Sequence, residues 1–145
     1  SIPKEGKWWV RQEGDKASEV PARFLFKGNE HKAKARYRGD MENHWRFAKK
    51  SWRVKFQKDN LFEGMRSINL IIPEDRGYFI EYVNNRIAEK LGLVVPRSRF
   101  VILRLNGAFQ GVYFEVEQWG KEFMEHRQQP DVNLYGEEDR DLNLR

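Results

Sequence analysis

Two segments of the chain alternate between basic and apolar side chains, and this alternation constrains the fold more than any other feature of the sequence. In residues 31–38, Lys or Arg follows His31 at every even position, and Ala or Tyr fills the remaining odd positions. Residues 51–56 repeat the pattern, with Arg53 and Lys55 between Trp, Val and Phe. Because side chains alternate between the two faces of a β-strand, each segment predicts a strand with one basic face and one apolar face directed to the core.

The remaining elements follow from other local patterns. Apolar side chains at four-residue spacings predict an amphipathic helix over residues 77–91, and residues 119–127 predict a shorter helix. Asn106-Gly107 between two apolar runs predicts a hairpin turn. Further strands are expected at residues 22–27, 67–72, 99–105, 110–117 and 132–135.

These elements define the expected fold class. Most links between strands are too short for the crossovers that parallel pairing needs. We therefore predict an α+β fold, a mostly antiparallel sheet of about five to seven strands covered by one principal helix. The 145 residues suffice for one domain, which we place at residues 1–135, with residues 136–145 as a mobile tail or the truncated start of a further part. The chain starts at Ser1 without Met and stops at Arg145 in polar sequence, so we expect a piece of a longer protein.

Composition excludes several kinds of site. The chain contains no cysteine, which excludes a disulfide scaffold, a cysteine metal site and a thiol nucleophile. The three histidines, His31, His44 and His126, lack the spacing of a zinc site. No apolar run approaches the roughly 20 residues of a membrane-spanning helix, so we expect no membrane span.

The positive charge is concentrated in the first part of the chain. The formal net charge is +5, but residues 1–59 carry 16 Lys and Arg against 8 Asp and Glu. Residues 31–58 alone hold ten basic residues and only two acidic ones, Asp40 and Glu42. A basic segment of this kind predicts an anionic partner, such as a nucleotide, a phosphate, a nucleic acid or an acidic surface.

The strongest candidate site is the turn that joins the two basic strands. Arg38-Gly39 would end the first strand, and a glycine at this point lets the backbone approach a ligand closely. Lys and Arg side chains of the second strand would then neutralise phosphates. The alternative is a solvated basic strand face, which is common in small sheets.

Carboxylates are further candidates. Glu81 and Glu89 lie on the expected helix, where either could pair with a strand lysine as a helix glutamate does in protein kinases. Glu117 ends the predicted hairpin, on the same strand face as Glu115 and near where the edge of a ligand would lie. The alternatives are a solvated glutamate for Glu81, and a rim charge or an arginine partner for Glu117.

Aromatic residues interleave with the basic ones, as they do in platforms that stack single-stranded nucleic acid. These aromatics are Trp45, Phe47, Trp52 and Phe56. Trp52 and Phe56 alternate with the charged side chains, so we expect them to face the core instead of the basic surface. Nucleic acid is therefore the less favoured anionic partner.

Several runs of the sequence, in their order and spacing, resemble the N-terminal portion of the spore-coat protein H (CotH) kinase family. The resemblance extends from about residue 33 to residue 135. The runs that carry it are Arg36-Tyr37-Arg38-Gly39-Asp40, Lys49-Lys50-Ser51-Trp52-Arg53-Val54-Lys55-Phe56, Ile68-Asn69-Leu70, Leu91-Gly92-Leu93-Val94-Val95-Pro96-Arg97, Leu105-Asn106-Gly107, Gly111-Val112-Tyr113 with Glu117, and Phe123 with Leu134-Tyr135.

This resemblance implies a nucleotide site in a fold like the N-lobe of an atypical kinase. Members of the family bind ATP with a divalent metal, Mg or Mn, and phosphorylate protein substrates. Which strand cation contacts phosphate stays open, although the alternation favours Arg53 and Lys55 over Lys50. The implied cofactor-binding residues are Arg38, Gly39, Lys50, Arg53, Lys55, Glu81 and Glu117.

The resemblance also places the family's catalytic and metal-binding Asp residues beyond residue 145. We therefore expect no catalytic residue and no metal ligand in this chain, and no activity without the remainder of the same polypeptide. The resemblance also implies a location at the cell surface or spore surface, as for some members of the family. Two alternatives stay open, a non-catalytic binding module for a polyanion or nucleic acid, and a surface or spore-coat structural domain that has lost the chemistry.

Overall fold

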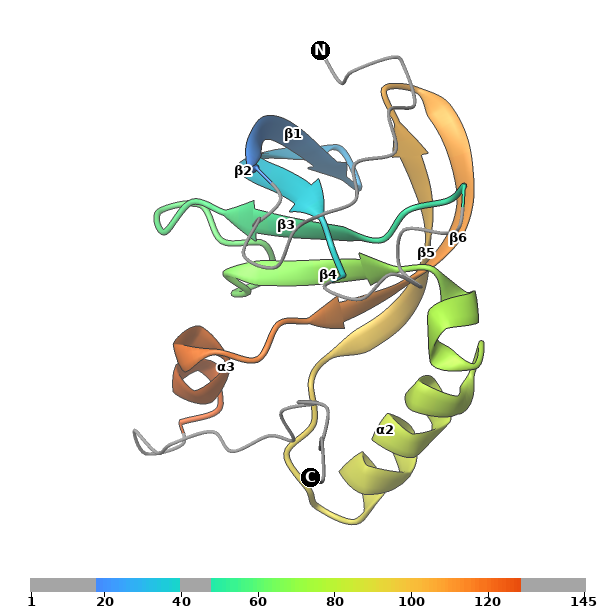
Figure 1. Ribbon diagram of the computed structural model, residues 1–145. Coiled ribbons are helices and arrows are strands. Elements are labelled where there is room, and N and C mark those ends of the chain that lie inside the picture. The colour runs from blue at the N-terminus through green and yellow to red at the C-terminus, as the bar shows by residue number, and fades with distance from the viewer. Residues whose placement is uncertain (1–17, 40–47, 129–145) are drawn as a thin grey trace, which may run out of the picture.

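The computed structural model describes residues 18–39 and 48–128 (Figure 1). Along these residues the strands and helices follow one another in the predicted order, while the strand expected at 132–135 lies outside the described residues. The elements are β1 (Val20–Phe26), β2 (Asn29–Tyr37), β3 (Trp52–Phe56), β4 (Ser67–Ile71), the 3₁₀ helix η1 (Pro73–Arg76), α2 (Ile80–Lys90), β5 (Ser98–Leu105), β6 (Ala108–Glu117) and α3 (Lys121–His126).

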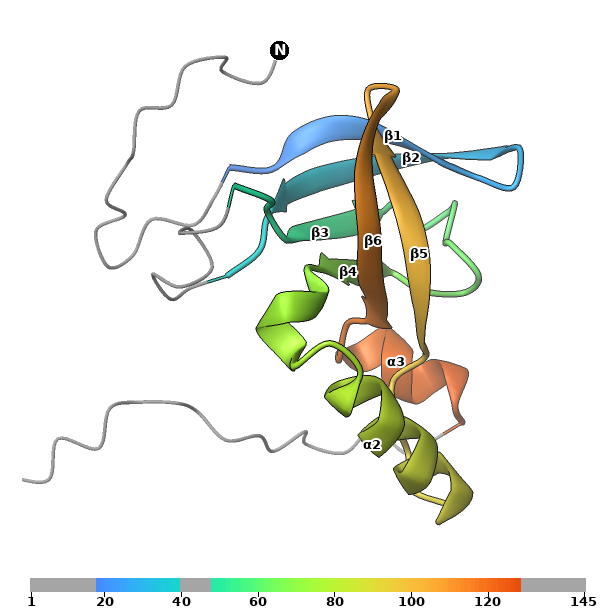
Figure 2. The same ribbon diagram turned by 90° about the vertical axis from the view of Figure 1, so that its right-hand side faces the viewer.

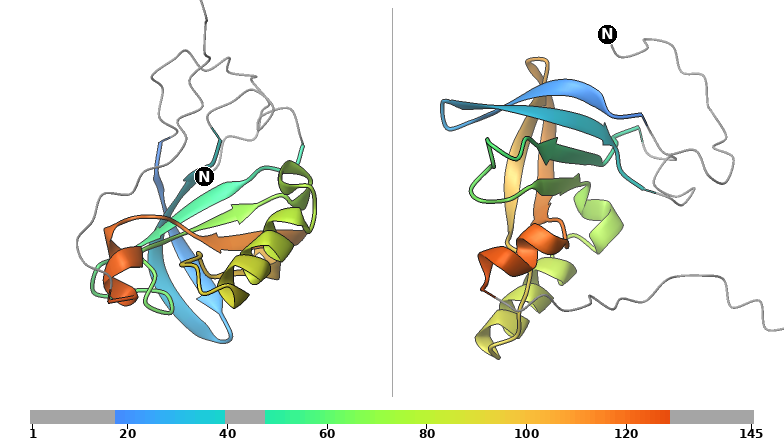
Figure 3. Two further views of the ribbon diagram at one scale, coloured as in Figure 1. Left: turned by 90° about the horizontal axis from the view of Figure 1, so that it is seen from below. Right: turned by 90° about the vertical axis from the view of Figure 1, so that its left-hand side faces the viewer.

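The six strands form one sheet in the order β1-β2-β3-β4-β6-β5, and every neighbouring pair is antiparallel. The sheet is strongly curved, because the long β5–β6 hairpin runs steeply across the direction of the first four strands (Figure 2). Strands β1 to β4 are stacked side by side in chain order, as the right panel of Figure 3 shows. The first basic strand therefore lies directly beside the second.

The register of the strands assigns every side chain to one of two faces, since residues directly opposite one another share a face. We call the face that carries the main core the inner face and the other the outer face. One row of the inner face runs through Ala35, Val54, Ile68 and Glu117. The adjacent row, on the outer face, runs through Arg36, Arg53, Asn69 and Val116.

The main core covers the inner face of the sheet. The predicted inward positions Val54 and Phe56 are buried there, which confirms the facing of β3. Edge-to-face aromatic contacts hold this core together, with ring centroids 5.2 Å apart for Phe24 and Phe56 and 4.9 Å apart for Phe24 and Phe62. A second, smaller cluster lies on the outer face, where Ile71, Phe114 and Val116 pack against Tyr82 and Phe100.

Helix α2 does not cover the sheet in the predicted way. The side chains at four-residue spacings, which we call the apolar stripe of α2, are all exposed, from 48% for Val83 to 72% for Leu91. The half-buried positions lie on the other side of the helix, where Tyr82 contacts the ring of Phe100. Most of the helix projects past the end of the sheet (Figures 1 and 2). The apolar stripe consists of Ile80, Val83, Ile87 and Leu91, whereas Phe79, although 64% exposed, has its ring centroid 5.5 Å from that of Phe100 in β5.

The prediction of an α+β fold like the N-lobe of an atypical kinase was therefore wrong. Six antiparallel strands dominate the described residues, and α2 is the only helix among them with more than six residues. A helix whose apolar side faces solvent does not form a second layer over a sheet. The described part of the chain is a curved, mostly β structure with a minor helix.

Candidate functional site

Five cations of β2 and β3 line up on the outer face of the sheet. Lys34 lies directly opposite Lys55, and Arg36 lies directly opposite Arg53. Like charges placed opposite one another on a sheet destabilise it, so this arrangement favours a bound anion that neutralises them. We call this surface the basic strip, and it consists of Lys32, Lys34, Arg36, Arg53 and Lys55.

Arg53 is held in place by two amide side chains. Its Nε donates to Oδ1 of Asn69 at 2.9 Å, and its second terminal nitrogen donates to Oε1 of Gln118 at 2.8 Å. Nδ2 of Asn69 donates to the same oxygen of Gln118 at 2.8 Å. The planar guanidinium is thus fixed in orientation on the outer face before any ligand arrives. Asn69 and Gln118 were not predicted as site residues.

Specific contacts also hold the region where β2 ends and β3 begins. The backbone N–H of Arg38 donates to the carbonyl of Ser51 at 2.9 Å, and Gly39 is buried with φ at +122°, a value that favours glycine. The carbonyl of Lys50 accepts a hydrogen bond from the hydroxyl of Tyr113 at 3.0 Å. Trp45, Phe47 and the rest of the loop after Gly39 lie outside the described residues.

The structure divides the seven predicted cofactor-binding residues among several places. Arg38, Gly39 and Lys50 lie where β2 ends and β3 begins, and Arg53 follows on the outer face. Lys55 lies on the same face, nearer the other end of β3. The Glu81 carboxylate lies 3.1 Å from Nη1 of Arg76, and Glu117 lies on the inner face.

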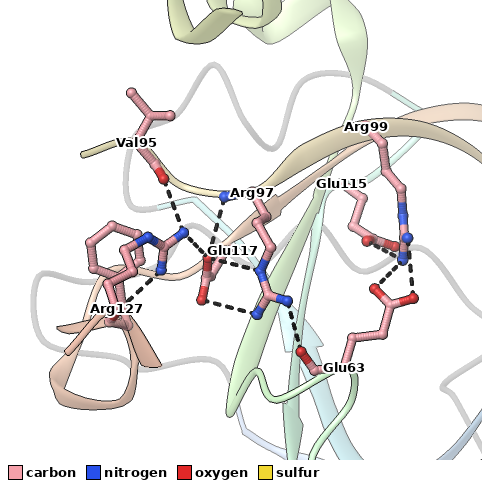
Figure 4. A network of polar contacts seen from close by, with 8 residues as sticks. Glu63, Val95, Arg97, Arg99, Glu115, Glu117 and Arg127 are labelled. Atoms are coloured by element: carbon pink, nitrogen blue, oxygen red, sulfur yellow. Dashed lines mark hydrogen bonds and ion pairs between the residues drawn. The ribbon is translucent and has the colours of Figure 1, made fainter. Parts of the chain in front are cut away.

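Glu117 is the centre of a buried ion-pair network at the end of β6 (Figure 4). Its Oε2 accepts hydrogen bonds from Arg127 at 2.8 Å and from the backbone N–H and Nε of Arg97 at 3.2 and 3.4 Å. Arg127 also donates to the carbonyls of Val95 and Phe123, each at 3.0 Å. These bonds tie the start of β5, the end of β6 and α3 to one carboxylate.

A second buried carboxylate extends the network along the same strand face, as the sequence predicted for these two glutamates. Oε1 of Glu115 lies 2.8 Å from a terminal nitrogen of Arg99, and that nitrogen lies 3.1 Å from a carboxylate oxygen of Glu63. The Arg99 guanidinium also lies over the rings of Phe26 and Phe62, with distances of 4.6 and 5.6 Å to their centroids. Such stacking stabilises a partly desolvated cation.

Burial and arginine contacts act in opposite directions on the two carboxyl groups. Burial raises the pKa of Glu115 above its ordinary value, and the nearby Arg99 guanidinium offsets this only in part. Burial alone would also raise the pKa of Glu117, but hydrogen bonds from Arg127 and Arg97 outweigh it and lower that pKa. Glu117 is therefore held as the anion that the two arginines need.

A cleft of about 470 Å³ lies beside this network and reaches residues of α2. Four arginines line it, but Arg86 pairs with Glu89, Arg99 with Glu115, and both Arg97 and Arg127 with Glu117. Their charges are already balanced by protein carboxylates. In the basic strip cations lie opposite cations, and among them Nζ of Lys34 lies 3.9 Å from a carboxylate oxygen of Glu19.

The described residues offer little to a metal ion on their own. They contain no group of three or more His, Asp or Glu side chains that could hold one. Nδ1 of His31 lies 2.9 Å from the Asn60 amide oxygen, and its ring packs edge-on against both Phe56 and Phe62. In the same part of the chain, no helix has the length and apolar character needed to cross a membrane.

Comparisons with known proteins agree with the resemblance seen in the sequence. The family model described as CotH kinase protein matches residues 35–145. The chain is also similar to "Inner spore coat protein H" of Bacillus subtilis (strain 168), with 29% identity over 99 residues. The match covers 68% of this chain but 27% of that protein, so the chain spans about a quarter of the length of this relative.

Proposed function

The chain belongs to the CotH kinase protein family, and from this membership we propose that it is the nucleotide-binding part of a protein kinase, with the phosphates of ATP on the basic strip. The observation that carries the proposal is the pairing of Arg36 with Arg53 and of Lys34 with Lys55 across β2 and β3. A row of phosphates along the outer face would contact the cations of both strands at once.

Arg53 is the residue to which we assign the central phosphate contact. Asn69 and Gln118 hold its guanidinium by the hydrogen bonds described above, so little rotamer freedom is lost when a phosphate binds. Gly39 would let the backbone near the turn approach the nucleotide. For Glu117 the two arginine partners support a structural role instead of a nucleotide contact.

The residues of the basic strip fit the phosphates of ATP but not a bare divalent metal. Bound ATP would supply the phosphoryl group for transfer to a protein substrate, with its Mg or Mn carried on the phosphates. As the family resemblance implies, further metal ligands and the base that activates the acceptor would come from elsewhere in the polypeptide. We therefore expect no phosphoryl transfer by this chain alone.

The place of the whole protein is also proposed by analogy. The relative is named as an inner spore coat protein, and we propose a spore-coat or cell-surface setting for the protein that contains this chain. A second candidate function has its own support, because the same five cations suit any polyanion, including single-stranded nucleic acid.

A calorimetric titration of the chain with ATP in the presence of Mg²⁺ tests the proposed function. We expect saturable binding that AMP reproduces only weakly, because AMP lacks the β- and γ-phosphates that the basic strip would contact. A single-stranded oligonucleotide serves as the competing ligand. Binding of the oligonucleotide with a steep salt dependence, and no saturable binding of ATP, would contradict the kinase proposal and favour the polyanion module.

A further inference from the structure

The apolar stripe of α2 is exposed on the side of the helix that points away from its own sheet. An α-helix has 3.6 residues per turn, so Val83, Ile87 and Leu91, at spacings of four residues, lie on one side of the helix. The half-buried positions, Glu81, Tyr82, Asn85 and Ala88, occupy the opposite side. An amphipathic helix ordinarily packs its apolar side inward, so α2 is reversed relative to the sheet on which it sits.

More apolar side chains are exposed after the end of α2. Leu93 and Val94 are exposed by 60% and 44%, and they line the cleft beside Asn85 and Glu89. Fully burying a large aliphatic or aromatic side chain stabilises a protein by about 1.5–3 kcal/mol, so leaving this many in water forgoes several kcal/mol. Apolar side chains exposed together along one side of a helix mark an interaction site.

The position of α2 restricts what covers the stripe. The helix packs through Tyr82 on Ile71, Phe114 and Val116, which lie on the outer face. Val116 lies directly opposite Asn69, which in turn lies opposite Arg53. A polypeptide segment that docks on α2 therefore lies on the same side of the sheet as the basic strip. Charge complementarity there favours a segment that carries carboxylates.

We propose that the apolar stripe of α2 is the docking surface for the remainder of the same CotH polypeptide, the part that carries the catalytic and metal-binding carboxylates. This inference rests on the proposed function for the identity of those carboxylates. It explains why the helix is reversed, because the stripe is an internal interface of a larger catalytic unit. It also agrees with the fraction of the spore-coat relative, 27%, that this chain matches.

Thiol labelling tests the proposal, because the chain contains no natural cysteine and one introduced thiol gives the whole signal. Ile87→Cys places that thiol on the stripe, and Lys58→Cys, in an exposed turn, is the matched control. Both variants are made in the 145-residue chain and in the full polypeptide that contains it. We expect the Ile87→Cys thiol to react with a maleimide at least tenfold more slowly in the full polypeptide, while the Lys58→Cys rate stays unchanged.

Three outcomes decide the matter. Equal Ile87→Cys rates in the two polypeptides overturn the docking surface, and Val83→Cys, one turn away, repeats the measurement should Ile87→Cys impair folding. Protection that already appears in the 145-residue chain and grows with its concentration assigns the stripe to a second copy and overturns the proposal. Labelling is done without nucleotide, so protection together with absent ATP binding would reject the proposed function while leaving the docking surface intact.

Discussion

Glu117→Gln is expected to lower the free energy of unfolding by about 3 kcal/mol at pH 7, the largest effect that we expect from a single substitution. The carboxylate is 3% exposed and binds both Arg97 and Arg127. A neutral amide of the same size keeps the packing but leaves two cations at this position without their anion. Urea denaturation of the two proteins, followed by circular dichroism, measures the difference.

The pH dependence of this loss identifies its electrostatic origin. The pKa of Glu117 is lowered in the folded chain, so its stabilising contribution is present above the unfolded pKa and is lost as the pH falls through the folded pKa. The difference between wild type and Glu117→Gln should therefore shrink as the pH drops below about 4.

Glu89→Gln is the matched control, because it removes the carboxylate of an exposed ion pair with Arg86. Exposed pairs of this kind contribute less than about 0.5 kcal/mol. Equal losses for Glu89→Gln and Glu117→Gln, or a loss at Glu117 that does not change with pH, would contradict the assignment of Glu117 as the anchor of the network.

Arg53→Ala is expected to weaken the binding of ATP with Mg²⁺ at least tenfold, which corresponds to about 1.4 kcal/mol. The physical reason is the loss of a charge-assisted contact from a guanidinium that Asn69 and Gln118 already orient. Arg53→Lys should recover only part of the affinity, because lysine keeps the charge but not the planar fork. Calorimetry of the three proteins measures the ratio, and thermal unfolding checks that each one folds.

Arg23→Ala controls for the loss of positive charge. Arg23 lies on the outer face of β1, is exposed, and forms a long ion pair of 3.6 Å with Glu30. Arg23→Ala changes the net charge by the same amount as Arg53→Ala. It should alter ATP affinity less than about twofold, since exposed charges are screened. Equal losses for Arg23→Ala and Arg53→Ala would show a general attraction of anions and not a site centred on Arg53.

The strands and the facing of the basic residues could be predicted from the sequence because both depend on local alternation. Val54 and Phe56 are buried and Lys55 is exposed, as a period of two requires. The partners of Arg53 could not be predicted in the same way. Asn69 lies on β4, next to β3, and Gln118 follows β6, the strand beyond β4, so these partners depend on the order of the strands in the whole sheet.

The arginine partner considered for Glu117 is present, as Arg97 and Arg127, but the pair of Arg99 with Glu115 could not be predicted, for a related reason. A regular hairpin closed by Asn106-Gly107 would place Arg99 opposite Phe114, with Glu115 on the other face. The register instead shifts by one residue between Leu103 and Arg104, near Gly111 with φ at +86°. This bulge brings Arg99 opposite Glu115. A one-residue shift changes which side chains of the two strands share a face, and the local sequence pattern does not predict such a shift.

The helix shows the limit of amphipathic patterns. The four-residue spacing of Val83, Ile87 and Leu91 predicted the helix itself, and residues 80–90 are helical. The pattern does not say which surface receives the apolar side. In this chain the outer face offers only a small cluster, formed by Ile71, Phe114 and Val116, and α2 meets it through Tyr82.

The location of bound nucleotide tests the central claim most directly. Backbone amide chemical shifts of the isotope-labelled chain, followed during titration with ATP and Mg²⁺, give that location residue by residue. We predict saturable shifts along the basic strip, centred on Arg53 and Asn69 and extending to Gly39. Shifts confined to the cleft beside Glu115 and Glu117, or no saturable shifts, would contradict the assignment of the outer face as the nucleotide site.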